Sequence, residues 1–217
     1  MKNAIITGSN GMIGNLILQN CLSNPEIKTV TSIVRRKSGI KHPKLVEIIH
    51  DNFLDFSSIN NQLTNQDICF YCIGVYTGQV PRAEFAKITI DYTKAFATAL
   101  RINSLETTFC FLSGQGADTS ETSKIMFAKD KGIVENILFK LKFYRTYCFR
   151  PGYIYPVTKR KEPNFTYALT RLLYKPLLSK VYPNIGVSSE KLANVMVLVG
   201  LNGYDEPILE NNAIRLY

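Results

Sequence analysis

Short apolar runs alternate with longer amphipathic stretches along most of the chain. The runs are rich in β-branched and aromatic residues and predict strands over 3–7, 29–34, 45–49, 67–73, 107–112 and 145–149. Most of them are almost continuously apolar, which is typical of parallel strands covered on both faces. Helical periodicity predicts helices over 12–22, 56–63, 82–102 and 123–141. This alternation indicates an α/β fold built on a doubly wound parallel sheet.

The pattern changes after about residue 155. The stretch 153–186 contains several prolines and tyrosines and a basic tripeptide at 159–161, and we expect one helix in it, over 166–174. Ser188 or Ser189 then provides an N-cap for an apolar helix over 190–200. Residues 206–217 add a last short strand. We interpret the chain as a single domain over 1–217, with a core at 1–155 and a small C-terminal substrate or lid lobe at 156–217.

Composition agrees with a folded enzyme-sized domain. The chain has 217 residues, of which 46% are hydrophobic and 20% charged, enough for one full core and unlike a disordered chain. No stretch approaches the roughly 18 apolar residues that span a bilayer. The N-terminus resembles a first strand rather than a signal peptide. We therefore expect a cytoplasmic protein with no membrane partner.

Cysteine, histidine and net charge narrow the chemistry further. There are five cysteines and two histidines, and most of the cysteines lie in strand-like runs, as small buried residues do. The pair Cys69 and Cys72 falls inside a predicted strand, so we expect neither a metal nor a redox site there. A net charge of +9 fits a pocket for an anionic ligand. No nucleic-acid-binding motif accompanies it, so no nucleic-acid partner is expected.

A glycine-rich turn between the first strand and the first helix is the strongest motif. Its spacing is G-x-x-G-x-x-G, and its residues are Gly8, Ser9, Asn10, Gly11, Met12, Ile13 and Gly14. The three glycines allow a tight turn, close approach of a pyrophosphate, and close packing of helix on strand. The helix N-terminus would then face the pyrophosphate. The motif predicts a Rossmann-type pocket for a nicotinamide dinucleotide; the alternative is a glycine turn without a ligand.

Three further strand ends contribute candidate cofactor contacts. Arg35 and Arg36 follow the second strand, where an acidic residue favours NAD and an arginine favours the 2′-phosphate of NADP. We therefore predict NADP, with NAD possible; a solvated basic loop is the alternative. The remaining candidates are Asp51 and Asn52 for the adenine and Cys72, Ile73 and Gly74 for the nicotinamide ribose. The alternative is that these residues are ordinary loop residues that follow a strand and bind no ligand.

Taken together, these markers resemble the short-chain dehydrogenase/reductase superfamily, in its atypical NAD(P)H-binding branch with the Tat-interacting oxidoreductase-like proteins. The likeness extends over about 3–155 and fades beyond. The residues that carry it are 7–14, 34–36, 72–74, 111–118, Lys131-Gly132 with Glu135, and Phe149-Arg150-Pro151-Gly152. The resemblance implies that Ser113 holds a substrate carbonyl and that Lys131 holds the nicotinamide ribose. It also places Pro151 beside the cofactor.

The chain departs from the superfamily pattern at the proton donor. The resemblance implies a Tyr four residues before the Lys, but this position is Phe127, and Thr89 stands near the position of the superfamily's helix Asn. A positioned acid typically contributes about 10²- to 10⁴-fold to a rate, and Phe carries no acidic proton. Another group, with Tyr76, Tyr153 and Tyr155 as candidates, could serve instead, water could serve, or the dinucleotide could bind without turnover.

The predicted function is therefore an atypical NADPH-preferring oxidoreductase that acts on a small-molecule carbonyl substrate. The alternative, favoured by Phe127, is a catalytically silent NADPH-binding sensor or protein-interaction module. Ser113 and Lys131 favour the enzyme. A monomer and a homodimer are both compatible with the sequence.

Overall fold

The computed structural model describes residues 1–157 and 186–217, and within them a seven-stranded sheet forms the centre of the molecule. Every neighbouring pair of strands in it is parallel, and the order is β3-β2-β1-β4-β5-β6-β9. The strands are β1 (Lys2–Thr7), β2 (Ile27–Val34), β3 (Leu45–Ile49), β4 (Ile68–Tyr71), β5 (Thr108–Leu112), β6 (Arg145–Arg150) and β9 (Ile208–Glu210). This confirms the doubly wound α/β fold.

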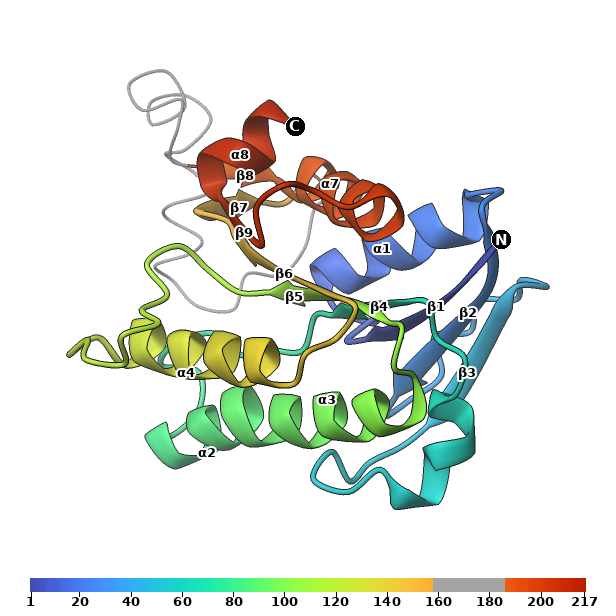
Figure 1. Cartoon of the computed structure of the whole chain (residues 1–217), viewed down its shortest axis with the longest axis horizontal. Helices are drawn as coiled ribbons and strands as arrows, with labels where there is room; N and C mark the ends of the chain where they lie inside the picture. Colours follow the sequence, from blue (N-terminus) through green and yellow to red (C-terminus); the bar gives the residue numbers. More distant parts are fainter. Residues whose placement is uncertain (158–185) are drawn as a thin grey trace.

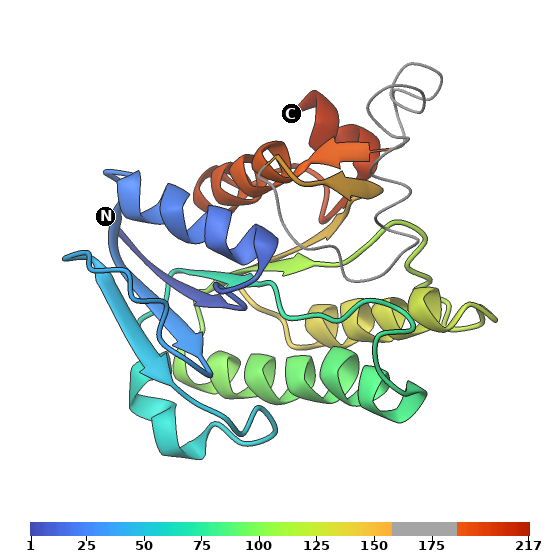
Figure 2. The same ribbon diagram turned by 180° about the vertical axis from the view of Figure 1, so that it is seen from behind.

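Helices cover both faces of the sheet (Figures 1 and 2). On one face lie α1 (Met12–Ser23) and α7 (Ser189–Asn202). On the other lie α2 (Arg82–Ala86), α3 (Tyr92–Asn103) and α4 (Met126–Lys140). The helix expected over 82–102 is continuous, but a π-helical segment, η2 (Lys87–Asp91), joins α2 to α3. The helix expected over 56–63 is a 3₁₀ helix, η1 (Ser57–Leu63).

The central strand β4 shows why its sequence is apolar without interruption. Ile68 and Phe70 pack in the core beneath α1 and α7, whereas Cys69 and Tyr71 pack in the core on the α3 and α4 side. All four residues are at most 1% exposed. Since successive side chains of a strand point to opposite faces, a strand with helices on both sides must be apolar at every position. Full burial of a large apolar side chain contributes about 1.5–3 kcal/mol.

The C-terminal residues complete the sheet. As predicted, α7 begins with a serine cap, because the Ser188 hydroxyl accepts a hydrogen bond from the Lys191 backbone N–H at 3.0 Å. The strand β9 then pairs with β6, and a short helix that the sequence did not predict, α8 (Asn211–Leu216), follows it. Two short strands, β7 (Tyr153–Tyr155) and β8 (Gly186–Ser188), pair separately. The helix expected over 166–174 lies outside the described residues, as does the part of the expected lobe at 158–185.

The cysteines are free thiols, and the described residues contain no cluster of metal ligands. All five cysteines are free, and burial raises the pKa of the Cys21 and Cys72 thiols to about 12, so both stay protonated at neutral pH. Over 1–157 and 186–217, no group of three or more His, Cys, Asp or Glu side chains could hold a metal ion. No helix within these two ranges is long and apolar enough to cross a bilayer.

Candidate functional site

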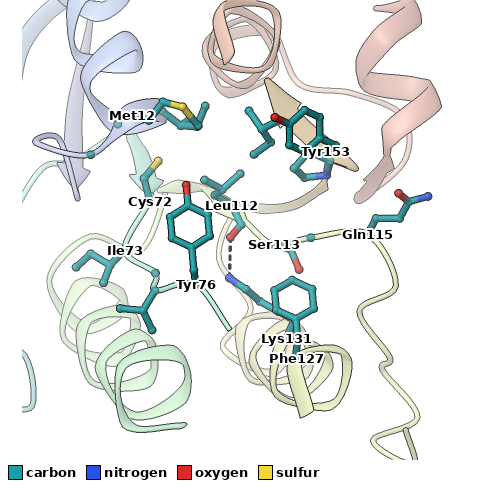
Figure 3. Close-up of a pocket in the computed structure, with 18 of the residues that line it drawn as sticks. Met12, Cys72, Ile73, Tyr76, Leu112, Ser113, Gln115, Phe127, Lys131 and Tyr153 are labelled. Atoms are coloured by element: carbon teal, nitrogen blue, oxygen red, sulfur yellow. Dashed lines mark hydrogen bonds between the residues drawn. The ribbon is translucent and has the colours of Figure 1, made fainter. Parts of the chain in front are cut away.

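A cavity of about 570 Å³ opens at the carboxyl ends of β1, β4 and β5 (Figure 3). Sequence-predicted residues that line it are Gly11, Met12, Ile13, Gly14, Cys72, Ile73, Gly74, Ser113, Lys131 and Pro151. Tyr76, Leu112, Phe127 and Tyr153 also line it. The cavity lies where the strand order reverses between β1 and β4. In open α/β sheets this switch point is where ligands bind.

The turn between β1 and α1 can be made only with glycine at two positions. Gly8 has a φ of 77°, and a Cβ on it would lie 2.8 Å from the backbone carbonyl atoms of Cys72. A Cβ on Gly14 would lie 2.2 Å from the Gly8 carbonyl oxygen. The turn is therefore pressed against the end of β4 on one side and against its own helix on the other. Both restrictions are steric and independent of any ligand.

The N-terminus of α1 faces the cavity without a capping side chain. Gly11 is the N-cap residue and makes no side-chain hydrogen bond to the first turn, whereas the next three residues, 12–14, all line the cavity. The first N–H groups of a helix have no partner within the helix, and they carry the positive end of its dipole. This arrangement can bind an anion such as a pyrophosphate.

Ser9 and Asn10 form bonds inside the protein, and the structure does not place either in the wall of the cavity. The hydroxyls of Ser9 and Ser32 are 2.7 Å apart and buried, so they join the turn to β2. The Asn10 side-chain amide donates to the Arg36 backbone carbonyl at 2.8 Å. The two side chains thus fix the end of β2, and with it the basic residues that follow, beside the glycine turn.

The other predicted adenosine contacts lie beyond the cavity wall. Arg35 and Arg36 are exposed at the end of β2, and neither guanidinium forms an ion pair with a described residue. Asp51 and Asn52 are exposed after β3. The Asn52 side chain accepts a hydrogen bond from the Leu54 N–H at 3.2 Å. These residues are therefore available at the surface next to the turn, with Asn52 partly engaged.

Helix α4 presents Phe127 and Lys131 to the cavity, one helical turn apart on the same face (Figure 3). The Phe127 ring is half-buried and lines the cavity. A Cβ on Gly114 would lie 2.4 Å from this ring. A Cβ on Gly132 would lie 1.7 Å from the Asp118 carbonyl oxygen. The two glycines thus bring the loop after β5 into contact with α4.

The Lys131 ammonium is buried and has no ionic partner in the part of the chain described. Its Nζ donates to the Leu112 carbonyl at 3.0 Å and lies 4.6 Å from the centre of the Phe111 ring. Burial lowers the pKa of Lys131 to about 8, although the charge of Glu135 acts in the opposite direction. A group with this pKa exchanges a proton near neutral pH.

Ser113 belongs to a buried ionic network that the sequence did not predict. Its hydroxyl donates to Glu135 Oε1 at 2.5 Å. Arg150 donates to the two Glu135 oxygens at 3.0 and 2.5 Å and to Glu210 at 2.9 Å, and these bonds raise the pKa of Arg150. Because a hydroxyl has one hydrogen, Ser113 offers the cavity only its lone pairs. Glu135 and Arg150 entered the sequence argument as family markers alone.

A second buried carboxylate fixes the loop that follows β4. Asp130 is fully buried on α4, and Arg82 donates to its two oxygens at 2.7 and 2.8 Å. Arg82 begins α2, at the end of the loop that carries Tyr76. Tyr76 and Tyr153 line the cavity, whereas the structure does not place Tyr155 in its wall. The ion pair therefore connects one wall of the cavity to the helix that carries Lys131.

Comparison with known proteins agrees with this geometry. No protein-family model matches the chain. It is 26% identical over 218 residues to Protein HTATIP2 of Rattus norvegicus, covering 98% of this chain and 88% of that protein. A short-chain dehydrogenase family protein of Francisella tularensis has a TM-score of 0.71 at 14% identity, with 99% of both chains covered. The chain is thus similar in sequence to HTATIP2 over nearly its whole length, and it shares its fold with a short-chain dehydrogenase family protein. The resemblance expected from the motifs is thus confirmed.

Two other similarities are useful for comparison. Protein FMP52, mitochondrial, of Candida albicans is 29% identical over 164 residues, which cover 74% of this chain and 69% of that protein. The Bordetella bronchiseptica enzyme WbmH, solved in complex with NAD⁺, has a TM-score of 0.68 at 16% identity and covers 93% of this chain and 72% of that one. The structural likeness concerns the fold. The functional argument for this chain therefore depends on its own residues.

Proposed function

We propose that this chain binds a nicotinamide dinucleotide, with NADPH preferred over NADH, and reduces a small-molecule carbonyl compound. The observation that carries the proposal is the uncapped N-terminus of α1, which faces a cavity whose opposite wall holds Lys131 and Ser113. Gly8 and Gly14 allow the tight turn that brings this helix end to the cavity, because a Cβ at either position would clash with neighbouring backbone atoms. The solved complex of WbmH with NAD⁺ supports the same class of cofactor.

Each part of the cofactor has candidate partners in this proposal. The first N–H groups of α1 bind the pyrophosphate, and Arg35 and Arg36 bind the 2′-phosphate of NADPH. Asp51 and Asn52 lie on the adenine side. The backbone at 72–74, with Lys131 and Pro151, lies along the nicotinamide ribose. When bound, the nicotinamide supplies a hydride.

The chain's own residues orient the substrate in this proposal. The carbonyl lies beside Ser113, and the apolar side chains of Met12, Leu112 and Phe127 limit the access of water. We propose no nucleic-acid or membrane partner, and the reaction is compatible with a monomer or a homodimer. We expect the reductase in the cytoplasm, although the fungal relatives are named mitochondrial; microscopy of a tagged chain in its own cell distinguishes the two.

One alternative function has specific support. Phe127 occupies the position of a proton donor, and the Ser113 hydrogen is bound to Glu135. A catalytically silent NADPH-binding sensor or protein-interaction module would need neither group for chemistry. In that case the dinucleotide binds as above, but its absorbance does not change with any carbonyl compound.

The experiment that tests cofactor binding is thermal unfolding with NADPH, with NADH and without ligand. Ligand at 100 times its dissociation constant stabilises the folded state by about 2.7 kcal/mol, so NADPH should raise the melting temperature more than NADH does. Replacing Arg35 and Arg36 together by Ala should weaken NADPH about 10- to 150-fold and leave NADH unchanged, because charge-assisted hydrogen bonds contribute about 1.5–3 kcal/mol. The absence of a shift with both dinucleotides would refute the proposal.

A screen of aldehydes and ketones with NADPH then separates the enzyme from the silent module. Oxidation of NADPH by the unmodified chain supports the reductase. If only Phe127→Tyr oxidises NADPH, the unmodified chain binds the dinucleotide without catalytic activity.

A further inference from the structure

Reduction of a carbonyl requires a proton for the new alcohol oxygen, and two groups in the cavity wall cannot supply it. Phe127 carries no acidic hydrogen. Ser113 has one hydroxyl hydrogen, which lies on the 2.5 Å bond to Glu135. Glu135 is itself fully buried and accepts two hydrogen bonds from Arg150, so its carboxylate is enclosed by partners. The proton donor must therefore be sought elsewhere on the wall.

Lys131 lies on the same face of α4 as Phe127 and reaches the same cavity (Figure 3). An ammonium group has three N–H donors, and one of them is bound to the Leu112 carbonyl at 3.0 Å. Its neighbour one turn along the helix, Glu135, is held instead by Ser113 and Arg150. On its other side lies the Phe111 ring. Two N–H groups of Lys131 thus have no acceptor among the described residues.

We propose that Lys131 is the proton donor of the reaction and contacts the substrate carbonyl oxygen directly. The inference rests on the proposed reductase function. The carbonyl carbon gains a C–H bond with the electron pair of the hydride from NADPH, the C=O π bond breaks, and its electrons form the O–H bond with a proton from Lys131. Lys131 is left as a neutral amine and takes a proton from water before the next turnover. Ser113 accepts a hydrogen bond and orients the substrate.

The surroundings of Lys131 suit this task. The charged and titratable groups that face it are Glu135 on α4, Cys148 on β6 and Cys72 after β4, and Tyr76 and Tyr153 line the same cavity. Burial lowers the pKa of Lys131 to about 8, close to the pH at which a general acid works best. Reduction needs the ammonium form, so its rate should fall as the pH rises through about 8.

The test compares Lys131→Arg with Lys129→Arg in the full chain. An arginine keeps the positive charge but does not release its proton, whereas Lys129 is an exposed residue of the same helix. Lys131→Arg should lower kcat by about 10²-fold or more, remove the fall above pH 8 and still show a melting-temperature shift with NADPH. Lys129→Arg should change none of these. An unchanged kcat for Lys131→Arg would overturn the inference. So would a loss of kcat in Tyr76→Phe that Lys131→Arg does not show.

A second readout does not depend on turnover. In a chain labelled with ¹³C and ¹⁵N lysine, the signal that disappears in Lys131→Arg should titrate at least one pH unit below that of Lys129. A midpoint near that of exposed lysines would overturn the inference. If NADPH binds and only Phe127→Tyr is active, Lys131 is not the donor although the cofactor site stands. The proposed function itself fails if NADPH does not bind, or if neither the unmodified chain nor Phe127→Tyr oxidises NADPH with any carbonyl compound.

Discussion

The two walls of the cavity are built in different ways. At the β1–α1 turn, Gly8 and Gly14 allow the backbone to pack closely against β4 and α1, and the backbone N–H groups of α1 provide the binding chemistry. At the β5–α4 wall the chemistry belongs to side chains, with Ser113, Glu135 and Arg150 bonded to one another. The comparison shows that a backbone-built site depends on the absence of side chains. A site built from side chains depends on partners from several elements.

The walls also differ in electrostatics. The turn carries a diffuse positive potential from a helix N-terminus and has no buried charge of its own. The α4 wall contains buried Asp130, Glu135 and Lys131, of which the two carboxylates have guanidinium partners and Lys131 has a backbone carbonyl. Burying a charge is costly unless it is paired. Lys131 has the weakest partner of the three groups, a backbone carbonyl, and it is the one that can exchange a proton near neutral pH.

The largest loss of stability should come from disrupting the ionic network of the β5–α4 wall. Glu135→Ala leaves the largely buried Arg150 with only Glu210, and removing one member of a buried ion pair costs about 3–5 kcal/mol. Urea unfolding should show this loss of unfolding free energy. Glu210→Ala is the control, because Glu210 is 53% exposed and exposed pairs contribute about 1 kcal/mol or less. Equal losses in the two variants would mean that the network is not a buried unit.

On the backbone-built wall, Gly14→Ala should have a smaller effect on stability but remove cofactor binding. The new Cβ would lie 2.2 Å from the Gly8 carbonyl oxygen, and overpacking costs about 1–3 kcal/mol. The melting temperature should fall, and the NADPH-induced shift should disappear. Gly200→Ala is the control: its Cβ would lie 2.9 Å from Ile68 and Phe70 side chains, so stability should fall while the NADPH shift persists. A retained NADPH shift in Gly14→Ala would argue against the glycine turn as the pyrophosphate site.

Lys131 allows a pH test of the α4 wall. Its pKa is lowered from 10.5 to about 8 in the folded chain, so between these values the unfolded chain binds more protons. The unfolding free energy should therefore rise with pH in this window, by on the order of 1–3 kcal/mol relative to Lys131→Met. Urea unfolding of both proteins from pH 7 to 10.5 measures the difference. Parallel pH curves would show that Lys131 titrates normally.

The smallest effect is expected where a side chain supports the backbone wall. Asn10→Ala removes one exposed hydrogen bond to the Arg36 carbonyl and should lower the unfolding free energy by about 0.5–1 kcal/mol. The NADPH shift should remain, because the α1 N–H groups are untouched. Loss of that shift would mean that side chains, too, build the turn.

The sequence pattern predicted the secondary structure correctly where interactions between residues close in sequence decide it. The strand over 45–49 has the predicted bounds, and the N-cap at Ser188 forms because a hydroxyl and a nearby N–H meet within one turn. The pattern did not distinguish the 3₁₀ helix η1 from an α-helix, since both place apolar residues three or four positions apart. The pairing of β7 with β8 was not predicted, because it joins three-residue strands from distant parts of the chain.

In the candidate site, too, the features set by residues close in sequence were predicted and those set by distant residues were not. The sequence determined the fold class, the glycine turn and the placement of Phe127 and Lys131 on one helix face, because spacing and steric limits act over a few residues. Only the tertiary structure decided that the Ser113 hydrogen is bound to Glu135 and that Arg150 joins them. It also decided that Lys131 is buried without an ionic partner among the described residues. Hydrogen bonding and desolvation depend on which side chains meet in space. For residues on β5, α4 and β6, the packing of the sheet and its helices decides this.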